Sequence, residues 1–134
     1  MKLNDKDIEN FYLSMKEEIS CWAKTSKGKK YHYTIELLEF PELFSLLNNI
    51  RISNNVMLSN PGLSKKINNT IQYIVSDLDI LPEFFIGPEG YLDDFYILCL
   101  CLRDIANHLG IEARTLGIDI EYVNGILDEG KNMF

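Results

Sequence analysis

The chain has 134 residues, of which 46% are hydrophobic and 25% are charged, and its formal net charge is −7. This length predicts one domain with a core of ordinary size. The longest apolar runs, Leu78–Ile86 and Phe95–Leu102, are interrupted or too short for the roughly 18 residues of a membrane span. The first ten residues are charged and lack the apolar core of a signal peptide, so we expect a cytoplasmic protein.

The negative charge is confined to the second half of the chain. Residues 1–60 hold eight basic and eight acidic side chains, whereas residues 61–134 hold five basic and twelve acidic ones. Direct nucleic-acid binding needs lysines and arginines that displace counterions, so this distribution argues against it. An acidic half is compatible with a partner protein that has a basic surface, or with solubility alone.

The first predicted helix covers residues 4–24, with Asn4 or Asp5 as its cap. Its apolar side chains recur at helical spacing and are Ile8, Phe11, Tyr12, Met15, Ile19 and Trp22. The opposite face is mixed and acidic, whereas a membrane-surface helix has a lysine-rich polar face. The stripe therefore predicts a helix that faces the core.

The next stretch offers weaker patterns. Residues 24–30, K-T-S-K-G-K-K, predict a solvated basic connector, because the spacing of a phosphate-binding loop is absent. Residues 31–37 alternate like a short strand but have no second strand to pair with, so they are either extended or the start of a helix. Pro41 is expected at the first position of a helix. A loop is expected over residues 50–62.

A further helix is predicted from Ser64 to a compact corner at residues 76–92. Ile67, Ile71 and Ile74 recur at helical spacing, and the Ser64 hydroxyl can cap the first turn. The pattern then breaks at three residues that disfavour regular helix, Pro82, Gly87 and Gly90. We expect these three residues to build the corner.

Asp93 and Asp94 precede the apolar run over residues 95–102. A carboxylate just before such a run is a typical N-cap, and its charge suits the positive end of the helix dipole. A long helix is therefore predicted from about residue 92 to residue 109, ended by Gly110.

The remaining residues predict one short and one longer helix. The short helix covers residues 111–115, and the last helix covers 119–127, with Gly117 between them and Gly130 beyond the end. The predicted fold is all-α, a small single-domain bundle of about five helices.

The central stretch resembles the YkvA-like domain family, which has no established function. The family core reads roughly Y-L-[IL]-S-P-x-D-[IL]-[IL]-P-[DE]-F and, after a short apolar link, G-Y-[LI]-D-D. The match covers about residues 67–104, at Tyr73, Ser76, Asp79, Leu81, Pro82, Glu83, Phe84, Gly90, Tyr91, Leu92, Asp93 and Asp94. Asp77 replaces the usual proline, and the link to Gly90 is longer. The resemblance implies a family core at about residues 64–109 and implies no activity.

The corner holds the densest group of potential oxygen ligands, Asp77, Asp79, Glu83, Asp93 and Asp94. Such ligands suit Mg²⁺, Ca²⁺ or Mn²⁺, although the spacing is not that of an EF-hand. One hypothesis is a divalent-metal-dependent enzyme with Asp79, Asp93 and Asp94 as ligands. The alternative is that Asp79 and Asp93 accept backbone N–H bonds and close the corner without any cofactor.

The three cysteines predict buried, reduced thiols rather than a site. Cys99 and Cys101 diverge around a helix, and Cys21 is far away in sequence. A Cys–His nucleophile pair has no local signature at His32 or His108.

The preferred hypothesis is a protein-interaction module without catalysis, because an acidic face steers association with a basic partner. This would suit an inhibitor, immunity or anti-defence factor of bacteria or phages that binds a nucleic-acid-handling protein. Aromatic residues bordered by charge are typical of interaction hot spots. The predicted contact residues are Asp77, Glu83, Phe85, Glu89 and Tyr91. A homo-oligomer formed through the aromatic group is compatible with either hypothesis.

Overall fold

The structure, a computed structural model, describes residues 4–52, 60–80 and 88–133 and, within these ranges, the side chains outside 78–80, 88–90 and 130–133. The described residues form seven helices and contain no strand, so the predicted all-α class is confirmed with more helices than expected. The helices are α1 (Asp5–Ala23), α2 (Ser26–Lys30), α3 (Thr34–Ile52), α5 (Pro61–Ile80), α6 (Pro88–Leu109), α7 (Glu112–Thr115) and α8 (Ile120–Met133).

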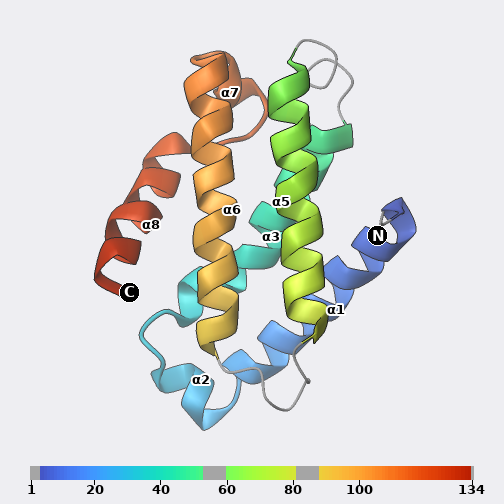
Figure 1. The fold of residues 1–134 in the computed structure, drawn as a ribbon. Helices are drawn as coiled ribbons and strands as arrows, with labels where there is room; N and C mark the ends of the chain where they lie inside the picture. Colours follow the sequence, from blue (N-terminus) through green and yellow to red (C-terminus); the bar gives the residue numbers. More distant parts are fainter. Residues whose placement is uncertain (1–3, 53–59, 81–87, 134) are drawn as a thin grey trace.

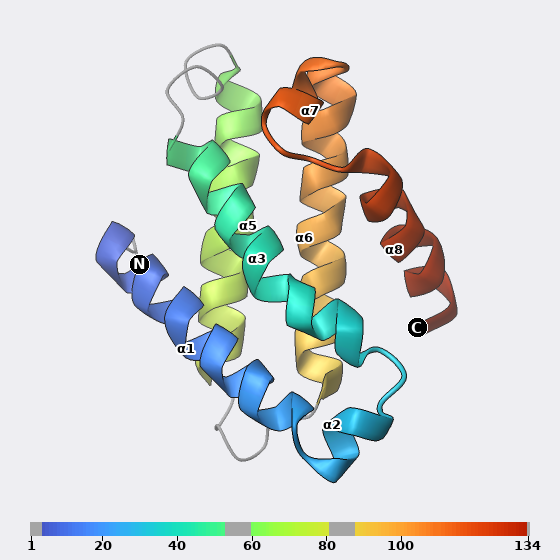
Figure 2. The same ribbon diagram turned by 180° about the vertical axis from the view of Figure 1, so that it is seen from behind.

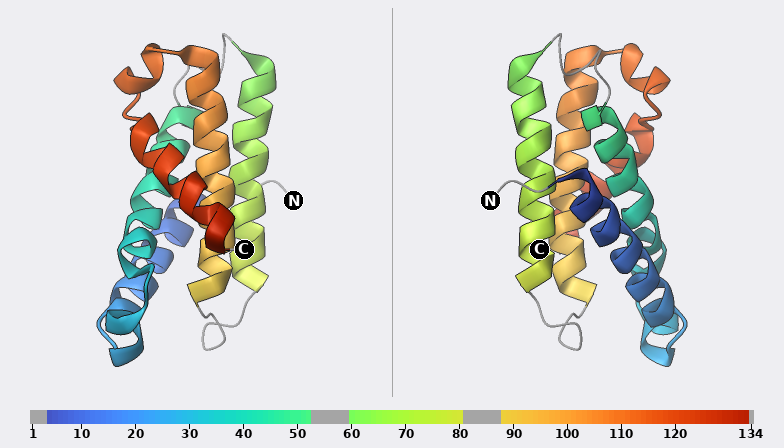
Figure 3. Two further views of the ribbon diagram at one scale, coloured as in Figure 1. Left: turned by 90° about the vertical axis from the view of Figure 1, so that its left-hand side faces the viewer. Right: turned by 90° about the vertical axis from the view of Figure 1, so that its right-hand side faces the viewer.

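Helix α6 lies at the centre of the molecule and contacts α3, α5, α7 and α8. Helix α5 runs antiparallel beside it, and α8 lies on its other side (Figure 1). Helices α1 and α3 form a second layer, with α2 joining them at the lower end (Figure 2). This second layer covers one face of the α5–α6 pair, and no helix of the described residues covers the opposite face (Figure 3).

The apolar run of α6 explains its central place. Phe95, Leu98, Cys99 and Leu102 are almost completely buried, which requires neighbours on several sides of the helix. The ring centroid of Phe95 lies 5.5 Å from that of Phe40 on α3, so the two layers meet through aromatic contact. No helix within the described ranges is both long and apolar enough to cross a membrane.

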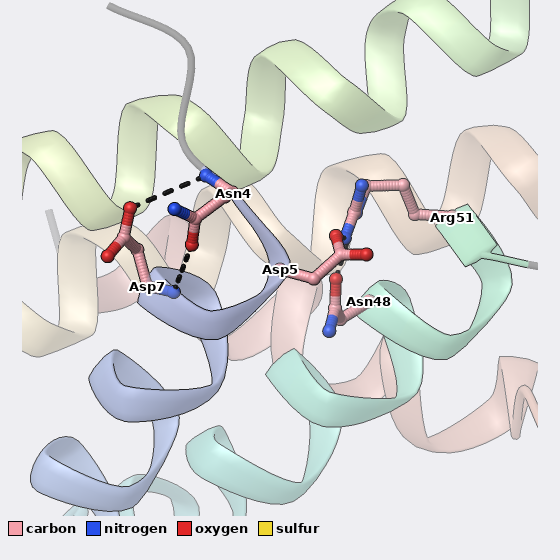
Figure 4. A network of polar contacts seen from close by, with 5 residues as sticks. All are labelled: Asn4, Asp5, Asp7, Asn48 and Arg51. Carbon is pink, nitrogen blue, oxygen red and sulfur yellow. Dashed lines mark hydrogen bonds and ion pairs between the residues drawn. The ribbon is translucent and has the colours of Figure 1, made fainter.

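The predicted first helix is confirmed, and of the two candidate caps, Asn4 and Asp5, Asn4 is the one that caps it. The Asn4 side chain accepts a hydrogen bond from the Asp7 backbone N–H at 2.8 Å, and the Asn4 backbone N–H donates to the Asp7 carboxylate at 3.4 Å (Figure 4). Arg51 at the end of α3 donates to Asp5 at 2.5 Å and to Asn48 at 2.9 Å. The contact between Arg51 and Asp5 joins the start of α1 to the end of α3.

The basic connector is more regular than predicted. Its central residues form α2, and the Thr25 hydroxyl caps this helix by accepting from the Gly28 N–H at 3.1 Å. The alternative left open at residues 31–37 is decided for a helix start, because α3 begins at Thr34. The Thr34 hydroxyl donates to the Gly28 carbonyl at 2.5 Å, which links α2 to α3.

Two prolines lie elsewhere than predicted: Pro41 is inside a helix, and Pro61, expected in the loop over residues 50–62, begins one. Pro41 lies inside α3 rather than at its start, where its missing N–H removes one helical hydrogen bond while its buried ring joins the core. Helix α5 begins at Pro61, the first helical position that proline favours. Asn60 caps it instead of Ser64, since the Leu63 N–H donates to the Asn60 side chain at 3.0 Å.

The predicted carboxy-terminal helices are confirmed in outline. Gly110 and Gly117 have φ angles of 60° and 94°, and they end α6 and α7 with a backbone geometry that other residues rarely adopt. The Asp119 carboxylate caps α8 by accepting a backbone N–H at 3.1 Å. Gly130, predicted beyond the end of this helix, lies inside it.

Candidate binding face on helices α5 and α6

The uncovered side of the α5–α6 pair carries a surface hollow of about 490 Å³. It is lined by Ile97 of α6 and by a line of α5 residues, Gly62, Lys65, Lys66, Asn69, Thr70 and Tyr73. Tyr73 is 51% exposed, and among the lining residues of α5 it lies nearest to the C-terminal end of the helix. We refer to this hollow, together with Asp77 and Asp93 beyond it, as the α5–α6 face.

Helical spacing explains why these residues share a face. The hollow-lining residues of α5 recur every three or four positions, and Asp77 continues the line one turn after Tyr73. The opposite side of α5 is apolar, and its Ile67, Ile71 and Ile74 are fully buried. The amphipathic pattern that drives α5 onto the core therefore also presents the polar line to solvent.

The two ends of the α5–α6 face differ in charge. Lys65 and Lys66 are exposed at one end, and the Lys66 ammonium forms an ion pair with Asp104 of α6. Asp93 is exposed and Asp77 is partly exposed at the other end. The half-exposed ring of Tyr73 lies between the two ends, so an aromatic surface is flanked by opposite charges.

Asp94 is the buried member of the acidic end. It is 0% exposed, and neither of its carboxyl oxygens accepts a hydrogen bond from an N–H or hydroxyl group of the described residues. Asp94 interacts with the carboxyl of Asp77, with which it can share a hydrogen bond only when one of the two is protonated. Two acids thus meet where α5 and α6 pack together.

The proton belongs to Asp94 at neutral pH. Its pKa is raised from 3.8 to about 8, first by burial, then by the hydrogen bond with Asp77 and its charge, and last by the charge of Asp93. The charge of Asp77, followed by that of Asp94, also raises the pKa of Tyr73. These four side chains therefore form one electrostatic group.

The structure corrects the predicted cap of the second long helix. Because α6 already begins at Pro88, Asp93 and Asp94 lie in its second turn and do not cap its start. Gly90, predicted as a corner residue, lies inside the same helix. The exposed position of Asp93 and the buried position of Asp94 follow from helical geometry, since adjacent residues point about 100° apart.

Tyr91, a predicted contact residue, belongs to the core instead. It is 6% exposed, its ring centroid lies 6.2 Å from that of Phe40, and its hydroxyl donates to Glu18 of α1 at 2.7 Å. Of the other predicted contact residues, Asp77 is partly exposed. Glu83, Phe85, Pro82 and Gly87 lie outside the described residues, as do the side chains of Asp79 and Glu89.

The metal hypothesis rests on Asp77 and Asp94 as the carboxyls brought together. Within the described ranges there is no group of three or more histidine, cysteine or acidic side chains that could hold a metal ion. Two carboxylates with water can still hold Mg²⁺, which usually keeps several waters. The pair found in the structure differs from the predicted set, because Asp93 points to solvent.

The cysteines contribute no reactive group to this face. Cys99 and Cys101 are buried as predicted, and burial raises the pKa of Cys99 to about 12. Burial also raises the pKa of Cys101, although a hydrogen bond with Thr70 acts in the opposite direction. Cys21 is exposed, contrary to the prediction, because it lies on the outer side of α1.

A second buried polar group, not expected from the sequence, lies between α3 and α8. The Tyr122 hydroxyl and one carboxylate oxygen of Glu36 are buried. Burial first, and then a hydrogen bond with Glu39, raises the pKa of Tyr122. This group lies away from the uncovered face and has no exposed ring.

Comparison with known proteins points to the same pair of helices. Residues 70–100 match the model of a family described as a protein of unknown function (DUF1232). No curated protein and no solved structure matches the chain. The DUF1232 segment runs from the middle of α5 to the middle of α6 and contains Tyr73, Asp77, Asp93 and Asp94. The shared part of the chain therefore includes the acidic end of the α5–α6 face.

The sequence signal for this face was present but incomplete. The spacing of Asn69, Tyr73 and Asp77 is readable as one polar line on a helix. Ile97 and Asp93 join the line only through the packing of α6 beside α5, which spacing alone does not give.

Proposed function

We propose that this chain is a small protein-interaction module that binds a basic partner protein through the α5–α6 face. The observation that carries the proposal is that the uncovered face holds a half-exposed Tyr73 next to the carboxylates of Asp77 and Asp93. Tyrosine in a hollow is a frequent centre of binding energy, and charges at the rim mainly raise the association rate.

The family match supports the choice of this face. The DUF1232 segment covers the acidic end, whereas the first two helices lie outside it. The twelve acidic against five basic residues after position 60 add a long-range attraction for a basic partner. Within this proposal, the chain is YkvA-like and cytoplasmic, and it acts as an inhibitor, immunity or anti-defence factor on a nucleic-acid-handling protein.

The test is photocrosslinking from inside the face. A photoreactive phenylalanine analogue is placed at Tyr73, and a second chain carries it at Ile111, which is 88% exposed in the turn after α6. In host lysate, we expect a basic protein to crosslink from position 73 and not from position 111. Equal crosslinking from both positions, or none from position 73, contradicts the proposal.

Charge reversal then tests the acidic end. The double change Asp77→Lys with Asp93→Lys is expected to lower affinity for the crosslinked protein about 10-fold or more, because two attractive rim charges become repulsive. The control, Asp128→Lys with Glu129→Lys, changes the net charge equally on the exposed part of α8. If both doubles lower affinity equally, the protein recognises net charge rather than this face.

The second candidate function is a divalent-metal-dependent enzyme, and one observation favours it. A fully buried carboxyl with both oxygens lacking strict hydrogen-bond partners among the described residues is a costly arrangement that a bound cation would relieve. Asp94 and Asp77 would be its ligands, together with the predicted Asp79.

Thermal unfolding with Mg²⁺, Ca²⁺ or Mn²⁺ tests this second candidate. A cation at about 100 times its dissociation constant would stabilise the fold by about 2.7 kcal/mol. Asp94→Asn should abolish that gain, while Asp104→Asn, at a partly exposed position of α6, should leave it. Unchanged melting temperatures with all three cations would exclude a site that stabilises the fold.

A further inference from the structure

Residues 20–35 form an acid-free, lysine-rich corner at the end of the molecule, and we call them the lysine corner. They contain Lys24, Lys27, Lys29 and Lys30 and no aspartate or glutamate. Since the whole chain carries −7, the remainder carries −11 against +4 in the corner. All four lysines are exposed, and the three ion pairs among the described residues use other cations.

The corner is a packed scaffold rather than a loose loop. Trp22 and Tyr31 pack edge to face with ring centroids 5.6 Å apart, and Tyr31 and Tyr33 do so at 6.0 Å. Gly28 is buried, and a Cβ added to it would lie 2.1 Å from the Trp22 carbonyl oxygen. The backbone of α2 therefore rests directly on the end of α1, which fixes the backbone positions that carry the lysines.

Two aliphatic side chains are exposed where α3 leaves this corner. Ile35 is 72% exposed and Leu38 is 42% exposed, and their spacing of three residues puts them on one side of the helix. Ile35 follows Thr34, the residue that fastens α3 to α2. Helix α2 lies at the outer lower end of the molecule, away from α8 (Figure 3). Lysines and aliphatic groups thus share one projecting end.

We propose that the lysine corner docks on an anionic membrane surface, with its four lysines on lipid headgroups and Ile35 and Leu38 at the level of the acyl-chain boundary. Surfaces that combine lysines with exposed aliphatic side chains bind such membranes through charge and apolar burial together. The long methylene stems of lysine also allow the ammonium to stay in water while the stem lies along apolar groups.

The details of the corner favour lipid over single-stranded nucleic acid. Stacking of bases needs open aromatic faces. The rings of Trp22, Tyr31 and Tyr33 pack against one another, and the exposed apolar groups are aliphatic. Glu39 is exposed four residues after Ile35 on the same side of α3, so its negative charge borders the aliphatic pair and ends the contact at Leu38.

The acidic remainder of the chain does not prevent this docking. At physiological ionic strength the Debye length is about 8 Å, so charges farther from the membrane than this are largely screened. The ends of α5 and α6 that carry the acidic end of the α5–α6 face lie at the same lower end of the molecule as α2 (Figure 1), but they belong to the other layer (Figure 3). An orientation with α2 and the α1–α3 layer toward the membrane leaves the outer side of α5 and α6, with the proposed partner-binding face, in solution.

The test uses the full chain with vesicles of phosphatidylcholine alone or mixed with phosphatidylserine. Co-sedimentation at about 0.1 M salt is expected only with the mixed vesicles, and it should disappear near 1 M salt, where the Debye length is about 3 Å. Trp22 is the single tryptophan of the chain and lies in the corner, so its emission should shift to shorter wavelength on binding.

Two matched pairs of variants separate charge from apolar insertion. Lys29→Gln with Lys30→Gln should weaken binding about 25-fold, at about fivefold for each lysine near the surface. Lys6→Gln with Lys65→Gln removes equal charge elsewhere and should change binding less than about threefold. Ile35→Ser should weaken binding about 10-fold, whereas Ile111→Ser, at an 88% exposed position outside the corner, should not.

Three results would overturn the proposal. The first is no binding to the mixed vesicles. The second is binding that both lysine doubles weaken equally, because the corner would then have no special part. The third is a combined result: Ile35→Ser binds the mixed vesicles as well as the wild type does, and the chain binds a single-stranded oligonucleotide equally well. The corner would then be a general polyanion site.

Discussion

Asp94 illustrates how one residue can combine the requirements of packing and of function. Its neighbours Leu92 and Phe95 are buried because the apolar pattern of α6 drives them inward, and Asp94 is buried with them. A charged carboxylate at this position would be expensive, so the residue remains protonated at neutral pH. The free energy needed to ionise the buried Asp94 therefore makes the stability of the fold depend on pH.

The sign of this dependence follows from the direction of the shift. The pKa of Asp94 is raised from 3.8 to about 8, so the folded state holds the proton that the unfolded state releases. The contribution to stability is complete below pH 3.8, declines as the pH rises, and is lost above about pH 8. Asp94→Asn keeps a neutral side chain and should flatten the fall in melting temperature between pH 5 and pH 8.

The exposed neighbour supplies the control for this measurement. Asp93→Asn removes a nearby carboxylate without removing the buried acid, so its curve should keep most of the wild-type slope. Parallel curves for wild type and Asp94→Asn would show that Asp94 ionises alike in the folded and unfolded states.

Gly28 is a position where an added Cβ atom would disturb the local structure. A Cβ there would lie 2.1 Å from the Trp22 carbonyl oxygen and 2.7 Å from the Ala23 Cα, and both are backbone atoms that cannot rotate away. Gly28→Ala should lower the free energy of unfolding by about 1–3 kcal/mol, as over-packed sites do.

A second glycine provides the opposite expectation. A Cβ at Gly125 in α8 would meet no atom within 4 Å, and its φ is not positive. Gly125→Ala should therefore stabilise the chain by about 0.4–1 kcal/mol in urea unfolding. If Gly28→Ala behaves like Gly125→Ala, then α2 does not rest on α1 as described.

At the scale of elements, α1 and α6 are joined by a polar contact between residues far apart in sequence. The Tyr91 hydroxyl donates to the Glu18 carboxylate at 2.7 Å in a partly buried environment. Hydrogen bonds to a charged acceptor contribute more than neutral ones. Tyr91→Phe keeps the ring and should lower the free energy of unfolding by about 1.5–3 kcal/mol.

A tyrosine–glutamate hydrogen bond at the surface gives a matched control. The Tyr12 hydroxyl donates to Glu42 at 3.2 Å in an exposed position, so Tyr12→Phe should cost less than about 0.5 kcal/mol. In a double-mutant cycle, Tyr91→Phe and Glu18→Gln should be non-additive because they share one bond. Equal costs for the two tyrosines would mean that the α1–α6 contact is not protected from water.

The helices also show which sequence patterns are enough to predict an element. Apolar stripes predicted α1 and the long α6 because packing and helical period agree there. Caps were less predictable: Asn4 was expected, whereas Asp93 and Asp94 resemble a cap but lie inside α6. A carboxylate before an apolar run is also compatible with a helix that has already begun. Pro41 is ambiguous in the same way: a proline can mark the first position of a helix, but here it lies buried inside α3.

At the scale of the whole molecule, the candidate face depends on packing that no local pattern contains. The polar line of α5 was readable from the sequence, but the place of Ile97 and Asp93 beside it depends on how α6 docks. The burial of Tyr91 was missed for the same reason, since Phe40 and Glu18 reach it from α3 and α1. The excess of acid was predictable, but the separation of the lysine corner from it depends on the place of α2 (Figure 3).

The charge of the whole molecule leads to a prediction about salt. A net charge of −7 on a compact chain is self-repulsive, while each of the three ion pairs among the described residues has at least one exposed partner and therefore a small energy. Lowering the Debye length from about 30 Å to about 10 Å with sodium chloride should therefore raise the free energy of unfolding by about 1 kcal/mol. For a chain of this size that corresponds to a rise of about 3–6 °C in melting temperature.

Two exposed positions make this prediction quantitative, because they change the net charge in opposite directions. Lys65→Glu takes the chain from −7 to −9, and Glu121→Lys takes it to −5. The rise of melting temperature with salt should be steeper for the first variant and shallower for the second, since screening matters most where repulsion is greatest. A melting temperature that falls with sodium chloride in all three chains would mean that the attractive pairs, above all Arg51 with Asp5, outweigh the repulsion among the acids.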